Sequence, residues 1–151
     1  MLAVAGATSL SCFSYSVTLR LPAVSRASVE ADASKQEEVI ALVGAVAREF
    51  GFVSNPRFDE IRHSSEVGDE YDHRLVADYV QPASSSDRII ISVGLEKTTG
   101  DQTVLIRDLD STGPTEKTQS IEDSLVRALS PRFPEGVIAI DRRTVGPDLG
   151  P

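Results

Sequence analysis

The sequence has little of what marks a redox, metal-cluster or membrane-spanning protein. It contains a single cysteine, Cys12, which cannot form an internal disulfide or a metal site built from several thiolates. It has no tryptophan, five phenylalanines and three tyrosines, so the core must be mostly aliphatic. No apolar run reaches the roughly 20 residues that a membrane-spanning helix needs. A chain of 151 residues, 25% of them charged, fits one ordinary folded domain.

Clustered positive charge is also missing. The 15 Lys and Arg residues are outnumbered by 23 Asp and Glu residues, which gives a formal net charge of −8. Nucleic-acid binders gain most of their affinity from grouped basic residues, so we expect no nucleic-acid partner. The sequence contains no Gly-x-Ser-x-Gly turn and no glycine-rich phosphate loop. The sequence therefore indicates no cofactor and contains no recognisable set of catalytic residues. This favours a non-enzymatic role, with an enzyme as the alternative.

Residues 1–12 have features of a truncated signal or lipoprotein leader. The segment MLAVAGATSLSC is apolar and rich in small residues, but the first basic residue of the chain, Arg20, lies beyond it. Ser11 and Cys12 match the end of a lipobox, whereas Leu10 stands one place later than that motif requires. Two interpretations follow. Cys12 is the lipidation site of an exported protein, or it is a small buried side chain at the edge of a strand.

Hydrophobic periodicity predicts strands and helices along the rest of the chain. Phe13 to Leu21 alternates apolar and polar residues, as a half-buried strand does. Helical spacing then runs from a capping box at Ser34–Glu37 to a stop at Gly51. Gly44 within this helix either permits close packing against a sheet or is simply tolerated at a cost of about 1 kcal/mol. Further elements are expected as strands at 74–80, 88–95, 103–109 and 136–142, a hairpin turn at Gly100, and a second helix at about 115–129.

This order of elements predicts an α+β fold, a ferredoxin-like two-layer sandwich. An antiparallel sheet of four to five strands would carry two helices on one face. The strand at 74–80, with Leu75, Ala77 and Tyr79 on one face, would be added at an edge. We expect a single domain over residues 13–143, followed by a frayed tail at 144–151.

The polar stretch between residues 53 and 74 is the richest in titratable groups. Its segment HSSEVGDEYDH contains His63, Asp69, Asp72 and His73, which are residue types that bind metal ions. These four residues are therefore candidate ligands for a metal-dependent enzyme or a metal binder. Their spacing matches neither one helical face nor a calcium loop, so a solvated acidic loop is the competing interpretation.

Asp108 and Asp110 form a second candidate site, at the end of the strand expected at 103–109. Alternate residues of a strand share a face, so both carboxylates could approach one cation. In the alternative interpretation, which is favoured, this is a polar strand end where Asp and Ser side chains accept hydrogen bonds from local backbone amides.

Four features together resemble small uncharacterised bacterial lipoproteins: a cysteine closely followed by a strand, and the segments REFGF, ISVGLEKTTGDQTVLIRDLDS and LSPRFPEG. The resemblance covers most of residues 12–142 and implies an envelope location, with no catalytic residue carried over. Phe13 after the cysteine would, by similarity to such proteins, fit sorting to the periplasmic side of the outer membrane. We therefore expect a non-enzymatic envelope domain that contacts a membrane surface through a lipid anchor and a protein partner through its sheet face or edge. A cytoplasmic ferredoxin-like regulatory or ligand-binding module is the alternative.

Overall fold

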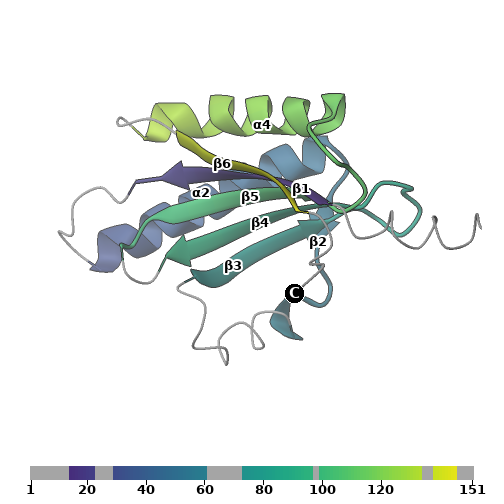
Figure 1. Ribbon diagram of the computed structural model, residues 1–151. Coiled ribbons are helices and arrows are strands. Elements are labelled where there is room, and N and C mark those ends of the chain that lie inside the picture. The colour runs from purple at the N-terminus through teal and green to yellow at the C-terminus, as the bar shows by residue number, and fades with distance from the viewer. Residues whose placement is uncertain (1–13, 23–28, 61–72, 97–98, 134–137, 146–151) are drawn as a thin grey trace, which may run out of the picture.

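A six-stranded antiparallel sheet and two long helices make up the fold (Figure 1). The computed structural model describes residues 14–22, 29–60, 73–96, 99–133 and 138–145. The strands are β1 (Ser14–Leu21), β2 (Val53–Ser54), β3 (His73–Val80), β4 (Ile89–Glu96), β5 (Gln102–Asp108) and β6 (Ile138–Val145). The helices are α2 (Val29–Glu49), α4 (Glu116–Leu129) and the short 3-10 helix η2 (Ser130–Arg132). The predicted α+β class is confirmed, in a sheet with one strand more than expected.

The strand order β2-β3-β4-β5-β1-β6 follows a ferredoxin-like pattern with strands added at one edge. β1 lies between β5 and β6, so the connection from β5 through α4 to β6 passes over β1. β4, β5, β1 and β6 are the four strands of the basic pattern. β3 pairs with β4 on one side and with the two-residue β2 on the other. The segment 74–80 is therefore an added strand near the edge, as the sequence predicts.

The core lies between the helices and one face of the sheet, because apolar residues recur at every second position of the central strands. Val17 of β1 lies opposite Ile106 of β5, and Leu19 lies opposite Val104. All four side chains are completely buried. Burying one such side chain contributes about 1.5–3 kcal/mol, so the helices must cover this face of the sheet.

Helix α2 begins earlier than its sequence pattern indicates. The expected start at the Ser34–Glu37 capping box is wrong, since the helix begins at Val29. The residues between Val29 and Ser34 include one Glu and two Ala, which are good helix formers. Nothing in this stretch stops the helix, so it continues upstream of the box.

The end of α2 is as predicted. Gly51 has a φ of 83°, a conformation that glycine adopts without steric cost. The Phe52 N–H donates to the carbonyl of Ala47 at 2.9 Å, and the Gly51 N–H donates to the carbonyl of Arg48 at 3.0 Å. These two hydrogen bonds form a Schellman motif, which satisfies carbonyls that the helix end would otherwise leave unpaired.

Helix α4 begins and ends close to the predicted residues. Thr115 is its N-cap, and the Thr115 hydroxyl accepts a hydrogen bond from the Thr118 N–H at 3.1 Å. In return, the Thr118 hydroxyl accepts from the Thr115 N–H at 2.8 Å, which completes a capping box. The helix then buries Ile121, Leu125 and Leu129 completely in the core.

Strands β3 and β6 differ from their expected forms. The register between β3 and β4 shifts between Leu75 and Ala77, which places Leu75 opposite Gly94. Leu75 therefore lies on the other face from Ala77 and Tyr79, so the expectation that all three share a face is wrong. β6 spans Ile138–Val145 and continues two residues into the segment expected as a tail.

Gly44 brings α2 close to Tyr79 of β3. A Cβ atom on Gly44 would lie 2.9 Å from the Tyr79 hydroxyl and 3.4 Å from its ring carbon Cζ. The same hydroxyl donates a hydrogen bond to the carbonyl of Ile40 at 3.2 Å. Burial raises the pKa of Tyr79, and the nearby charge of Arg48 opposes this shift. The hydroxyl thus fills the space beside Gly44, which supports close packing against the sheet rather than a glycine that is merely tolerated.

Replacing Gly44 with alanine should destabilise the protein, although alanine is the better helix former by about 1 kcal/mol. The added methyl group overlaps the hydrogen-bonded Tyr79 hydroxyl, and overpacking of this kind costs about 1–3 kcal/mol. Tyr79→Phe removes the obstructing oxygen, so G44A should cost less in that background when both are measured by urea unfolding. Gly113→Ala is the control, because nothing lies within 4 Å of its added Cβ. A G44A protein at least as stable as the wild type would contradict the contact.

Candidate functional site

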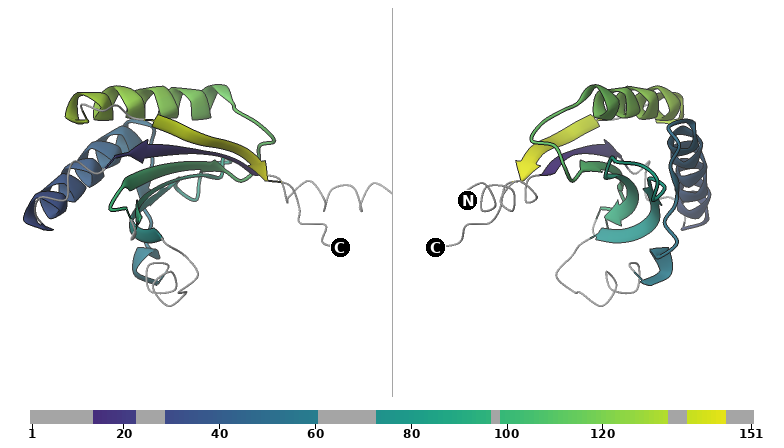
Figure 2. Two further views of the ribbon diagram at one scale, coloured as in Figure 1. Left: turned by 60° about the vertical axis from the view of Figure 1, so that its left-hand side comes forward. Right: turned by 90° about the vertical axis from the view of Figure 1, so that its right-hand side faces the viewer.

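The sheet is strongly curved, and both long helices lie on its outer, convex side (Figure 2). The opposite, concave side is what we call the open face. None of the described helices or strands covers it. In Figure 1 the open face is turned toward the viewer, with α2 behind the sheet. The open face is therefore the side of the sheet that does not pack against α2 and α4.

The open face carries hydroxyl, charged and aliphatic side chains at the positions that alternate with those facing the helices. Most of them are half-buried, and Ser14, Asp78 and Thr103 are buried. From β1 and β5 its members are Ser14, Ser16, Thr18, Arg20, Thr103, Leu105 and Arg107. From β3 and β4 they are Leu75, Asp78, Val80, Ile90, Ser92 and Gly94. A Cβ atom on Gly94 would lie 3.0 Å from the Thr103 hydroxyl, which confirms that β4 and β5 present Gly94 and Thr103 on the same side of the sheet.

Asp78 is a buried carboxylate on the β3 side of the open face, with 7% of the residue exposed. Its Oδ1 accepts a hydrogen bond from the Ser92 hydroxyl at 2.6 Å, and its Oδ2 accepts from the Asn55 side-chain amide at 2.7 Å. The Asn55 N–H also donates to the carbonyl of Asp78 at 2.9 Å. Buried polar groups are normally paired in this way. Asp78 therefore holds the chain that follows β2 against the sheet.

Arg20 and Asp101 form an ion pair at the end of the open face where β4 and β5 are joined. The Arg20 Nε donates to Asp101 Oδ2 at 2.6 Å, and Nη2 contacts the same oxygen. The turn beside them has Gly100 at a φ of 75° and a hydrogen bond from the Glu96 N–H to the Asp101 carbonyl at 2.8 Å. The hairpin turn is thus as predicted, and Asp101 neutralises Arg20 at this end of the face.

A groove of about 330 Å³ lies at the opposite end of the sheet, beside the connection from β3 to β4. Its apolar lining consists of Val80, Pro82, Ala83, Ile89, Ile90 and Leu109. Two charged residues that also line it are held in ion pairs. Lys117 Nζ of α4 lies 2.8 Å from Asp87 Oδ2, and Arg88 Nε lies 3.3 Å from Asp110 Oδ2. The groove is therefore an apolar surface bordered by neutralised charges.

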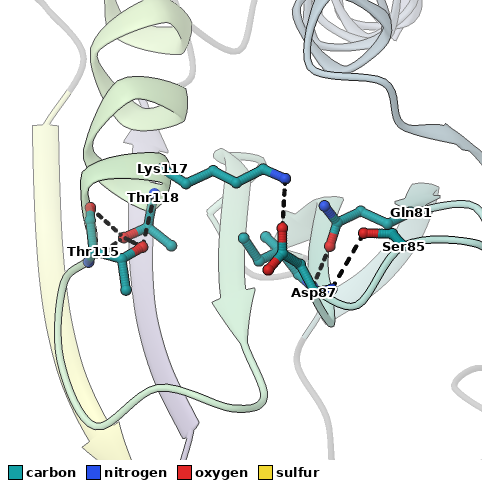
Figure 3. Close-up of polar contacts among 7 residues, drawn as sticks. Gln81, Ser85, Asp87, Thr115, Lys117 and Thr118 are labelled. Atoms are coloured by element: carbon teal, nitrogen blue, oxygen red, sulfur yellow. Dashed lines mark hydrogen bonds and ion pairs between the residues drawn. The ribbon is translucent and has the colours of Figure 1, made fainter.

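Polar contacts fix the connection that forms one wall of this groove (Figure 3). Gln81 Oε1 accepts a hydrogen bond from the Ile89 N–H at 2.9 Å, and the Ser85 hydroxyl accepts from the Asp87 N–H at 3.2 Å. The hydrogen bond and the charge of Lys117 hold the pKa of Asp87 below its ordinary value of 3.8, and a hydrogen bond from Gln81 acts in the same direction. The start of α4 is thus linked to the groove.

Lys117→Met should raise the pKa of Asp87 toward 3.8, because both the hydrogen bond and the opposite charge are removed. Lys117→Arg keeps the charge and should keep the pKa low. A lowered carboxyl pKa stabilises the fold at pH values above the unfolded pKa, and this contribution disappears as pH falls through the folded value. NMR titration of the Asp87 carboxyl carbon measures the shift. Identical pKa values in K117M and the wild type would show that Lys117 is not its cause.

Most of the predicted metal ligands lie outside the described residues. This applies to His63, Asp69 and Asp72, and also to the predicted lipidation site Cys12. His73 begins β3, where its backbone pairs with Glu96 of β4. Across the described ranges, no group of three or more His, Cys, Asp or Glu residues could hold a metal ion. A metal site in this stretch stays a prediction.

Asp108 and Asp110 lie in different local structures. β5 ends at Asp108, so Asp110 belongs to the following turn. Asp108 Oδ1 accepts a hydrogen bond from the Asp110 N–H at 3.0 Å, while the Asp110 carboxylate pairs with Arg88. The Ser111 hydroxyl likewise accepts from the Gly113 N–H at 3.2 Å. These are the local backbone contacts of the favoured interpretation, and they direct the two carboxylates to different partners.

Sequence reasoning missed Asp78 and Arg107 as residues of the open face. The period-two pattern that identifies buried residues in β3 and β5 also places the residues between them on the opposite face. The pattern does not indicate which of those side chains are hydrogen-bonded to other side chains. Asp78 is buried and hydrogen-bonded, whereas Arg107 is exposed. This difference between Asp78 and Arg107 depends on contacts with residues that are distant in sequence, such as Asn55 and Ser92.

Comparison with protein-family models, curated proteins and solved structures finds no match to this chain. Within the ranges that the structure describes, no helix is both long and apolar enough to cross a bilayer. Function must therefore be inferred from the geometry of the chain itself.

Proposed function

We propose that the chain is a non-enzymatic interaction domain of the bacterial cell envelope, held at a membrane surface by a lipid on Cys12 and binding through its open face. The observation that carries this proposal is the difference between the two faces of the sheet. Helices α2 and α4 cover one face, while the concave face carries hydroxyl groups, arginines and a few aliphatic side chains. Since none of the described elements covers it, this face is suited to contact another molecule.

The edges of the sheet are less suited to binding than the open face. β2, at one edge, is two residues long. β6, at the other edge, contains Asp141, Arg142 and Arg143, and its register with β1 shifts between Thr18 and Leu19. Short edge strands, charged residues and bulges are features by which proteins prevent another strand from adding to an edge. The proposal therefore places binding on the face of the sheet.

The position of Cys12 supports a tether at one end of the sheet. β1 begins at Ser14, two residues after the cysteine, and two residues span at most about 7 Å. A lipid on Cys12 would therefore hold the membrane near the start of β1. β5 and β6 end beside this point, because both run antiparallel to β1. A single acyl chain binds a membrane only marginally, so stable anchoring would require more than one.

Labelling of bacterial cells with a palmitate analogue tests the tether directly. The wild-type chain should incorporate the label and fractionate with membranes, whereas Cys12→Ser should do neither. The substitution exchanges a thiol for a hydroxyl of similar size, and circular dichroism of both purified proteins checks that the fold is unchanged. Equal labelling of the two proteins, or no label in the wild type, would contradict the tether.

A further inference from the structure

Val53 is an exposed aliphatic residue next to the apolar groove. Among the residues that the structure describes, it is the one large hydrophobic residue that is exposed, with 47% of its surface accessible. It belongs to β2 and lies opposite Val80 of β3. Residues that lie opposite each other in an antiparallel pair point to the same side of the sheet, and Val80 lines the groove. An exposed aliphatic side chain and an apolar groove are therefore neighbours on one surface.

Contacts within the chain fix the shape of the groove. Its wall is held by the hydrogen bond from the Ile89 N–H to Gln81 and by the ion pair between Lys117 and Asp87 (Figure 3). A side chain that enters a pre-formed site loses less free energy to the ordering of its surroundings. The groove is therefore suited to receive an apolar side chain.

The size of the groove fits the side chain of Val53 from another molecule. Val53 does not line the groove of its own chain. An isopropyl group has three carbon atoms, each comparable in size with a water molecule, whose share of liquid volume is about 30 Å³. Three such groups occupy about 90 Å³, well below the groove volume of about 330 Å³. A valine side chain can therefore enter the groove without moving its walls.

The adjacency of Val53 and the groove makes this surface complementary to itself. In a dimer with two-fold symmetry, both subunits use the same patch, so a residue that contacts a site on the partner has its own neighbouring site contacted in return. If Val53 of one subunit enters the groove of the other, the symmetry axis brings the second Val53 to the first groove. One two-fold contact thus buries both exposed valines and fills both grooves.

The charges around the groove also favour a second copy of the chain. Asp87 and Asp110 balance Lys117 and Arg88, and all four side chains are partly exposed. The whole chain has a net charge of −8, so two copies repel each other on average. At this balanced surface, two copies meet without net local repulsion, and each charge faces a surface that also offers the opposite sign. A strongly acidic or basic partner would find only half of these charges favourable.

We propose that the chain forms a two-fold symmetric dimer in which Val53 of each subunit enters the groove of the other. A small apolar ligand would fill the groove but would leave Val53 exposed, whereas a second copy buries both. This contact lies at the end of the sheet and goes beyond the binding proposed for the open face. It does not depend on a lipid at Cys12.

Sedimentation velocity of the full-length Cys12→Ser chain over a range of concentrations measures the dimer without any contribution from lipidation. Val53→Thr keeps the shape of the side chain but places a hydroxyl group in an apolar groove, so the dissociation constant should rise about a hundredfold, tenfold for each of the two side chains. Ser54→Val is the matched control. Ser54 is the neighbouring exposed residue of β2 and lies opposite Tyr79, whose side chain is on the other face, so S54V should leave the dissociation constant unchanged.

Nuclear magnetic resonance (NMR) spectra of the Val53→Thr protein check that its fold is retained. A wild-type chain that stays monomeric up to millimolar concentration would overturn the dimer. Equal dissociation constants for V53T and the wild type would overturn Val53 as its contact.

Disulfide trapping tests the geometry of the contact. In the Cys12→Ser background, a Val53→Cys protein mixed with an Ala83→Cys protein should form a mixed disulfide-linked dimer, because Ala83 lines the groove that Val53 enters. A Ser54→Cys protein mixed with the Ala83→Cys protein should not form one, since Ser54 lies on the other face. Equal yields from the two mixtures, measured by mass spectrometry, would contradict this arrangement.

An apolar dye distinguishes the second copy from a small ligand. 8-Anilinonaphthalene-1-sulfonate should compete with the dimer for the groove and shift it toward monomer. If the chain were monomeric without the dye, and the dye shifted the methyl resonances of Val80 and Ile90, the groove would be assigned to a small apolar ligand and the dimer would be overturned. Either result leaves the proposed tether standing, because palmitate labelling tests the tether separately.

Discussion

The two faces of the sheet differ because apolar side chains recur at every second position of its central strands. Val17, Leu19, Val104 and Ile106 all point to the same side and are completely buried there. Two amphipathic helices are enough to cover that side, and they lie on the convex surface of the curved sheet. The composition of the concave face follows from this placement of the apolar side chains on the convex side. The concave side does not have to contribute to the core, so its strands can carry hydroxyl groups and charges.

The contacts that fix the helices also fix the open face. Gly44 lets α2 approach Tyr79 closely, and the Tyr79 hydroxyl is hydrogen-bonded to the helix backbone. At the other end of the fold, the ion pair from Lys117 holds the start of α4 to the connection that lines the apolar groove. The strands that present the open face are thus the same strands that are held against the helices. The spacing of the side chains on such strands is therefore set by backbone hydrogen bonds.

Local patterns in the sequence predict the elements of this fold better than their details. Alternation in β1 and β4, the stop at Gly51 and the turn at Gly100 all depend on neighbouring residues, and each is confirmed. The start of α2 was missed because Ser34 and Glu37 match a capping box while helix formers continue upstream of them. The bulge that moves Leu75 to the open face depends on how β3 pairs with β4, which the residues of β3 do not reveal. The position of Arg107 beside Ser16 depends in the same way on the pairing of β1 with β5, two strands that are distant in sequence.

The central claim is that the concave face of the sheet is partly accessible, with Thr18 and Leu105 half-buried, while the convex face is completely buried. Solvent paramagnetic relaxation enhancement on the full 151-residue chain tests it most directly, with methyl resonances as probes and a soluble gadolinium chelate as the reagent. The methyl groups of Thr18 and Leu105, on the open face, should be broadened, whereas those of Val17 and Ile106 should be protected. If Thr18 and Leu105 were as protected as Val17, another part of the chain would cover the open face, and the account of its function would be contradicted.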